Sequence, residues 1–189
     1  GLLVWIYMME IINHSVSLFV REEALIKGTT LPVSVYVMRL AMQAAIRAGY
    51  ALVGCLGILL LSGTEVTAAW TWSALGMMLI LAVSPAVIAI FGLVGAYFPD
   101  SQFVVSNLMR VGMFLTPVFW VYTPGEGGIR SAFYWYNPFT YFLEIVRAPI
   151  VHGTMPGQAL LLCLAMGLAV WILALLMLGR LRKRLAFVI

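Results

Sequence analysis

The stretch that decides the fold lies in the second half of the chain and reads Tyr134-Trp135-Tyr136-Asn137-Pro138-Phe139-Thr140-Tyr141-Phe142-Leu143-Glu144-Ile145-Val146-Arg147. It is aromatic and apolar, but it is too short and too interrupted to cross a bilayer, which takes about 20 apolar residues in one helix. Asn137 and Pro138 predict a helix start, because Asn caps free N–H groups and Pro tolerates the first helical position. Pro149 is expected to end this helix about three turns later, since Pro forces the residue before it out of the helical region.

The same stretch carries one pair of opposite charges. Glu144 and Arg147 are i,i+3 neighbours on the predicted helix, so their side chains can form an ion pair. A capped, aromatic half-helix with one ion pair thus lies between two long apolar segments, and its role depends on them.

The composition of the chain predicts an integral membrane protein. Of its 189 residues, 63% are hydrophobic and only 10% are charged, against about 25% charged residues in a soluble domain. The formal net charge of +4 does not indicate nucleic-acid binding, because the basic residues are not gathered into one patch. We therefore expect an all-α membrane protein that contacts lipids and no nucleic acid.

Apolar segments alternate with short polar ones, which predicts a polytopic helical bundle. We expect five spans, at residues 1–20, 33–61, 73–98, 103–122 and 157–179. The basic cluster at residues 180–184 follows the last span, and positive charge beside a span indicates the cytoplasmic side. Counting back from this cytoplasmic C-terminus places residues 21–32 and 98–102 inside, and residues 62–72 and 123–156 outside.

This count also places Gly1 outside the membrane. No positively charged segment precedes Gly1, so the chain does not open on a signal peptide. We therefore expect one more span upstream and six spans in the full protein, with both ends cytoplasmic. Residues 1–189 then form a single membrane domain that lacks its N-terminal cytoplasmic segment and its first span.

The polar interruption at residues 21–32 has an amphipathic pattern. Charged residues flank a short apolar run, and Gly28 and Pro32 stop the helix, which predicts a short helix at the membrane surface. It is either a solvated loop or a docking element for a soluble partner. The residues that would make the docking contacts are Arg21, Glu22, Glu23, Leu25, Ile26 and Lys27.

Polar side chains within the predicted spans are a second signal. In the first span they recur at helical spacing, at Glu10, Asn13, His14 and Ser17. Such a stripe should face other helices or a wet cavity, because lipid contact is costly. Arg47 lies deep in the second span, where snorkelling, pairing with Glu10 and contact with an anionic head group all stay open.

Two rows of small residues predict close packing between helices. They are Ala41, Ala45 and Gly49 in the second span and Gly92 with Ala96 in the third.

Four local patterns, in this order, resemble one family. Residues 1–5 are similar to the start of its second span, and residues 17–32 to its cytoplasmic coupling segment. Ala96-Tyr97-Phe98-Pro99-Asp100 resembles a turn in which the family commonly shows Arg-Asp. Thr116-Pro117-Val118-Phe119-Trp120, followed by residues 136–147, resembles its most recognisable region. The family is the permease subunit of type-2 ABC exporters, in particular the bacterial group that exports O-antigen, capsule and teichoic acid polymers.

That resemblance implies a homodimeric permease in the bacterial inner membrane and not an enzyme. Two separate ATP-binding cassette ATPase subunits on the cytoplasmic face would bind ATP and Mg²⁺. Residues 21–32 would be the coupling helix, and residues 124–150 would be re-entrant helices of an outer gate that includes Asn137, Pro138, Glu144 and Arg147. The substrate would be a lipid-linked polysaccharide, and the candidate path residues are Trp5, Glu10, Arg47, Trp120, Tyr134 and Trp135.

The sequence agrees on one independent point and leaves alternatives open. It contains no Gly-x-x-x-x-Gly-Lys-Ser/Thr phosphate loop, so energy must come from another chain or from a gradient. A type-2 ABC permease for a drug or small lipid is one alternative. Another is a gradient-driven transporter or channel, in which Glu10, His14 and Arg47 relay protons or ions. An intramembrane enzyme is disfavoured, because the spans hold no paired aspartates, Ser/His arrangement or metal cluster.

Overall fold

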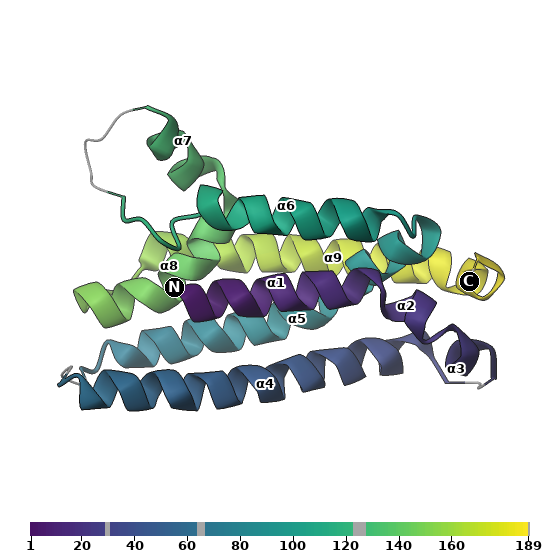
Figure 1. Cartoon of the computed structure of the whole chain (residues 1–189), viewed down its shortest axis with the longest axis horizontal. Helices are drawn as coiled ribbons and strands as arrows, with labels where there is room; N and C mark the ends of the chain where they lie inside the picture. The colour runs from purple at the N-terminus through teal and green to yellow at the C-terminus, as the bar shows by residue number, and fades with distance from the viewer. Residues whose placement is uncertain (29–30, 64–66, 123–127, 189) are drawn as a thin grey trace.

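The structure is a computed structural model that describes residues 1–28, 31–63, 67–122 and 128–188, with side chains up to residue 180. These residues are all-helical and include no strand (Figure 1). The helices are α1 (Leu2–Val16), α2 (Leu18–Arg21), α3 (Glu23–Gly28), α4 (Val33–Leu61), α5 (Trp70–Tyr97), α6 (Ser101–Leu115), α7 (Ile129–Tyr136), α8 (Pro138–His152) and α9 (Gly157–Val188).

Three of these helices are long and apolar enough to cross a membrane. They are α4, α5 and the part of α9 from Gly157 to Arg180, which supports a membrane protein. Helices α1 and α6 have 15 residues each, or about 22 Å at the α-helical rise, against the roughly 30 Å of a hydrocarbon core. The span predicted at 103–122 is therefore a shorter helix, because Thr116 is extended and Pro117 follows it.

Helix α5 is the centre of the bundle, and α1, α4, α8 and α9 pack around it. Half of its most apolar window is buried within the chain, compared with 11% for α4 and 17% for α9. Helices α4 and α9 thus turn most of their apolar side chains outward, as helices that contact lipid or another subunit do.

Close packing on α5 depends on glycine. A Cβ atom at Gly95 would lie 1.7 Å from the Val16 carbonyl oxygen, and one at Gly92 would lie 2.9 Å from the Phe19 ring. The predicted packing role of Gly92 is confirmed, and Ala96 is buried beside it. The tightest contact is at Gly95, which the predicted row does not include.

The small-residue row predicted on α4 shares only Ala41 with the small residues that are buried within this chain. The buried small residues are Ala41, Ala44 and Ala48, while a Cβ atom at Gly49 would meet no atom within 4 Å. The buried stripe follows the i, i+3, i+7 spacing of a helix that packs on one side, whereas the predicted row kept to i+4 steps.

The polar segments lie at the two ends of the bundle. Figure 1 shows α2, α3 and the C-terminal end of α9 at one end. It shows α7, the start of α1 and the end of α4 at the other. The charged segment at residues 21–28 and the quoted aromatic stretch are therefore separated by the full length of the long helices.

Candidate functional site

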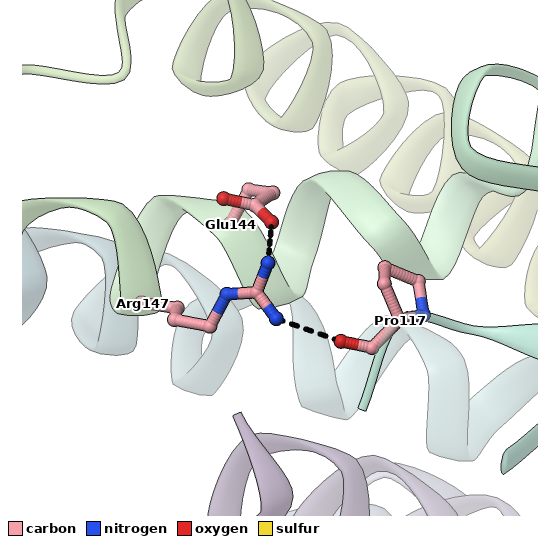
Figure 2. Close-up of polar contacts among 3 residues, drawn as sticks. All are labelled: Pro117, Glu144 and Arg147. Atoms are coloured by element: carbon pink, nitrogen blue, oxygen red, sulfur yellow. Dashed lines mark hydrogen bonds and ion pairs between the residues drawn. The ribbon is translucent and has the colours of Figure 1, made fainter. Parts of the chain in front are cut away.

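The Glu144–Arg147 ion pair forms as predicted, and it links α8 to the segment that follows α6 (Figure 2). Arg147 Nη2 donates to Glu144 Oε1 at 2.6 Å, and Nη1 donates to the Pro117 carbonyl oxygen at 2.8 Å. The side chains of Arg147 and Glu144 are only 15% and 12% exposed. One guanidinium therefore satisfies a buried carboxylate and a backbone carbonyl together, as its fork of donors allows.

Asn137 makes a second link to the same segment. Its side-chain oxygen accepts the Phe139 N–H at 3.0 Å, and its side-chain nitrogen donates to Thr116 Oγ1 at 2.7 Å. The first bond confirms Asn137 as the N-cap of α8, with Pro138 at the first helical position. The second bond gives the cap a tertiary role that a local pattern cannot predict.

The prediction that Pro149 ends this helix is wrong. Helix α8 continues to His152 and ends at Gly153, which has a left-handed φ of 65°. Pro149 lacks the N–H that would bond the Ile145 carbonyl, four residues earlier. Helix α8 packs on α5, and its buried residues include Leu143, Ile145 and Pro149. This packing stabilises the helix although one of its hydrogen bonds is missing.

Two residues of α5 that the sequence analysis missed receive the middle of α8. A Cβ atom at Gly76 would lie 2.9 Å from the Ile145 carbonyl oxygen, so only glycine leaves room for it. Ser73 Oγ donates to the adjacent Val146 carbonyl oxygen. Ser73 and Gly76 are three residues apart and so lie on the same side of an apolar helix. This spacing could have predicted that the backbone of another helix packs closely on that side of α5.

Aromatic side chains connect α7 to Tyr122, in the segment that follows α6, and to α8. Tyr122 and Tyr134 stack with ring centroids 4.4 Å apart, and Trp135 meets Tyr134 edge-on at 5.4 Å. The Tyr141 hydroxyl donates to the Trp135 carbonyl oxygen at 2.7 Å. Burial raises the pKa of the Tyr134 phenol above its usual value, because the charged form is poorly solvated there.

The remaining candidate path residues lie in separate places within this one chain. Trp5 is fully buried and meets Phe139 edge-on at 5.5 Å. The half-buried Trp120 donates its indole N–H to the Phe114 carbonyl oxygen at 3.2 Å. A cavity of 460 Å³ beside Trp5 is lined by α1, α5, α6 and the junction of α7 and α8, and its walls are mostly apolar.

Glu10 and Arg47 form an ion pair between α1 and α4. Of the possibilities open for Arg47, pairing is thus the one that the structure contains. The pair borders a cavity of 240 Å³ that is otherwise lined by apolar residues of both helices. His14 is exposed, and Asn13 Oδ1 is buried with no hydrogen-bond partner among the described residues.

The predicted coupling residues form two short helices instead of one. Glu22 lies between α2 and α3 and pairs with Arg39 of α4 at 3.5 Å. Glu23 and Lys27 pair along α3 at 2.6 Å. Ile26 packs against the core, whereas Leu25 is 48% exposed and Arg21 is also exposed. The segment therefore presents charged and apolar side chains beyond the end of the bundle.

Within the described residues, no group of three His, Cys, Asp or Glu side chains is placed to hold a metal ion. No protein-family model matches the chain, and no curated protein matches it either.

We expect Asn137→Ala to lower the thermal stability of the protein. Losing the cap costs about 1 kcal/mol, and losing the bond to Thr116 adds to this. Thr116→Val is the matched variant, because it removes the hydroxyl that accepts from Asn137 and leaves the bond between Asn137 and the Phe139 N–H in place. Thermal unfolding in detergent should rank wild type first, Thr116→Val second and Asn137→Ala last. Equal unfolding temperatures for wild type and Asn137→Ala would contradict the role of the cap.

Proposed function

We propose that this chain is the membrane-spanning permease subunit of an ATP-driven exporter of the type-2 ABC class that it resembles. Its substrate is a lipid-linked polysaccharide, and its membrane is the bacterial inner membrane. The observation that carries the proposal is that the charged segment at residues 21–28 and the aromatic helix α7 lie at opposite ends of an apolar bundle (Figure 1). One is suited to receive motion from a soluble partner, and the other is suited to close an outer opening.

The inner end supports coupling because α2 and α3 are connected to two different long helices. Phe19 of α2 is fully buried and packs at Gly92 of α5. Glu22 pairs with Arg39 of α4. A displacement of α3 by a bound ATPase subunit would therefore reach both α4 and α5. The basic C-terminal cluster lies at the same end, which is the cytoplasmic end in the proposed topology.

The outer end supports a gate because α7 and α8 are too short to span and are fixed at their junction. Non-helical backbone at membrane depth is tolerated only where protein or a water-filled cavity covers it. Asn137 and Arg147 provide that cover for the extended segment at Thr116 and Pro117. We propose that α7 and α8 are the re-entrant gate helices of a permease with six spans in its full length.

A second copy of the chain is part of the proposal. Helix α6 has one buried residue among its described positions, Met109. Its apolar side chains instead point outward, with Phe103 72%, Leu108 65% and Phe114 68% exposed. Lipid and a partner subunit would share this surface and the outward faces of α4 and α9, and the transport path would lie between the subunits.

Transport by inside-out membrane vesicles from the native cells tests the function. We expect uptake of labelled lipid-linked glycan to require ATP and to continue in the presence of a protonophore. Cells that lack the chain should lose surface polysaccharide and accumulate the lipid-linked precursor. Uptake that a protonophore abolishes and ATP does not drive would indicate a gradient-driven transporter. Normal surface polysaccharide in the deleted cells would instead favour a drug or small-lipid substrate.

Charge reversal tests the coupling role of α3. We expect the double variant Glu22→Lys and Glu23→Lys to reach the membrane in normal amounts but to lose transport several-fold. Partly exposed ion pairs contribute only about 0–1 kcal/mol, so lost stability cannot account for such a decrease. The measurement is ATP-dependent uptake, normalised to the amount of protein.

The variant that combines Glu22→Lys, Glu23→Lys and Arg39→Glu is the control for this experiment. It restores an ion pair between residue 22, at the junction of α2 and α3, and α4, while it keeps the reversed charges offered to a partner. Transport that stays low in this triple variant indicates docking through the charges at residues 22 and 23, whereas recovery would assign the effect to the internal pair. Wild-type transport in the double variant would reject the docking role.

A further inference from the structure

A separate pocket of 330 Å³ lies between α7, α8 and the start of α9. Tyr141 and Glu144 lie on one stripe of α8 and form one wall. Tyr134 and Trp135 of α7 and Gln158 of α9 also line it, and small or apolar residues of α8 and of the segment that leads into α9 form the rest of the wall. The pocket shares no lining residue with the cavity of 460 Å³. The pocket is thus distinct from the apolar cavity beside Trp5.

The aromatic wall of the pocket is held in place by contacts within the protein. Tyr122 stacks on Tyr134, and the Tyr141 hydroxyl is bonded to the Trp135 carbonyl oxygen. Trp135 is nevertheless 44% exposed, so part of its indole is open to a ligand. Aromatic side chains fixed in this way offer a flat apolar surface at little entropic cost.

The polar groups of the pocket lie beside these rings. Arg147 engages one oxygen of Glu144, and Figure 2 shows the other oxygen pointing away from Arg147. That oxygen is an acceptor whose orientation is fixed by the ion pair. The exposed amide of Gln158 adds two donors and one further acceptor. The charge of Glu144 is offset by Arg147, so the pocket does not select an ion.

From this combination we infer that the pocket binds one neutral sugar ring. A pyranose has a face of C–H groups that packs on an aromatic ring. Its hydroxyl groups can donate hydrogen bonds to a carboxylate, and can both donate to and accept from an amide side chain. The volume lies at the lower end of the roughly 300–1,000 Å³ of ligand pockets, which suits a single ring. The inference rests on the proposed function only for the source of the sugar, which is either the exported glycan or free glycan outside the cell.

The test is direct binding to the purified full chain in lipid nanodiscs, without ATP and without a partner subunit. The probes are the methyl glycosides of glucose, galactose, mannose, rhamnose and N-acetylglucosamine, together with oligosaccharide released by mild acid from the surface polysaccharide of the native cells. Saturation-transfer NMR reports which sugar protons touch the protein, and tryptophan fluorescence gives the affinity. We expect at least one probe to bind through its ring C–H protons.

Two substitutions of adjacent aromatic residues make the test specific. Trp135→Leu keeps an apolar side chain but removes the aromatic face, and we expect it to weaken binding about tenfold. Tyr136→Leu makes the same kind of change on the same helix, at a side chain that is 87% exposed and outside the pocket, and binding should not change. Gln158→Leu should weaken binding several-fold. Equal affinities in the two aromatic variants, or no binding of any probe to the wild type, would overturn the inference.

The binding test and the export test fail independently. Polysaccharide export without sugar binding in nanodiscs would overturn the pocket and leave the proposed function standing. Binding that depends on Trp135, in a chain that exports no polysaccharide, would support the pocket and overturn the proposed function. Comparing the released oligosaccharide with the same glycan on its lipid carrier identifies the source. Tighter binding of the lipid-linked form supports the exported glycan, and binding of the free form alone supports external glycan.

Discussion

Arg147→Ala should destabilise the protein by about 3–5 kcal/mol, the range found when one partner of a buried ion pair is removed. The Glu144 carboxylate is 12% exposed and would remain in the interior without its cation. The Pro117 carbonyl oxygen would also lose its donor. Unfolding by a graded denaturant in detergent micelles is the measurement. Arg147→Lys should recover only part of the loss, because one ammonium group lacks the planar fork that reaches both acceptors.

A double-mutant cycle separates the pair from its surroundings. We expect Glu144→Gln and Arg147→Ala together to cost less than the sum of the two single changes, with a coupling energy of about 0.5–3 kcal/mol. The exposed Glu23–Lys27 pair is the matched control, since its side chains are about half exposed and such pairs contribute little. Strict additivity at residues 144 and 147 would show that the two side chains do not act as a pair.

Gly95→Ala should have the second large effect, because it pushes α1 and α2 away from α5. The new Cβ atom would lie 1.7 Å from the Val16 carbonyl oxygen and 2.6 Å from its carbonyl carbon. Both are backbone atoms, which cannot move aside as the end of a side chain does. Overpacking costs typically 1–3 kcal/mol and occasionally more, and we expect a loss at or above the top of that range.

Thermal unfolding and limited proteolysis measure this effect. In Gly95→Ala, residues 21–28 should become easier to cleave, because α2 loses its contact with α5. Gly49→Ala is the control, since its Cβ atom meets no atom within 4 Å. Alanine within a helix should stabilise that position by up to about 1 kcal/mol. An unchanged unfolding temperature in Gly95→Ala would show that the helices can separate there without cost.

Local chemistry made part of the candidate site predictable from the sequence. The cap at Asn137 and the Glu144–Arg147 pair depend on residues two or three positions apart, and both are confirmed. The bonds from Asn137 to Thr116 and from Arg147 to Pro117 join residues 21 and 30 positions apart. The residue pattern of a single helix predicts contacts within that helix, so it cannot predict bonds to another segment of the chain.

Tertiary packing explains where the sequence predictions failed. Pro149 was expected to end α8, but contacts with Ser73 and Gly76 of α5 stabilise the helix past it. The fourth predicted span was too long because hydropathy does not register the extended turn at Thr116. Composition was enough to predict that the described residues are helical and that α4, α5 and most of α9 are long and apolar enough to cross a membrane.

The two bonds that α8 makes to the end of α6 have a mechanical consequence. A single bond acts as a pivot about which α8 could turn, but bonds at Asn137 and Arg147 lie about 15 Å apart along the helix axis and converge on the adjacent residues Thr116 and Pro117. Two attachment points, unlike one, prevent α8 from turning about a single bond relative to residues 116 and 117. Any movement of α8 at this end must therefore either break one of the two bonds or carry residues 116 and 117 along with α8.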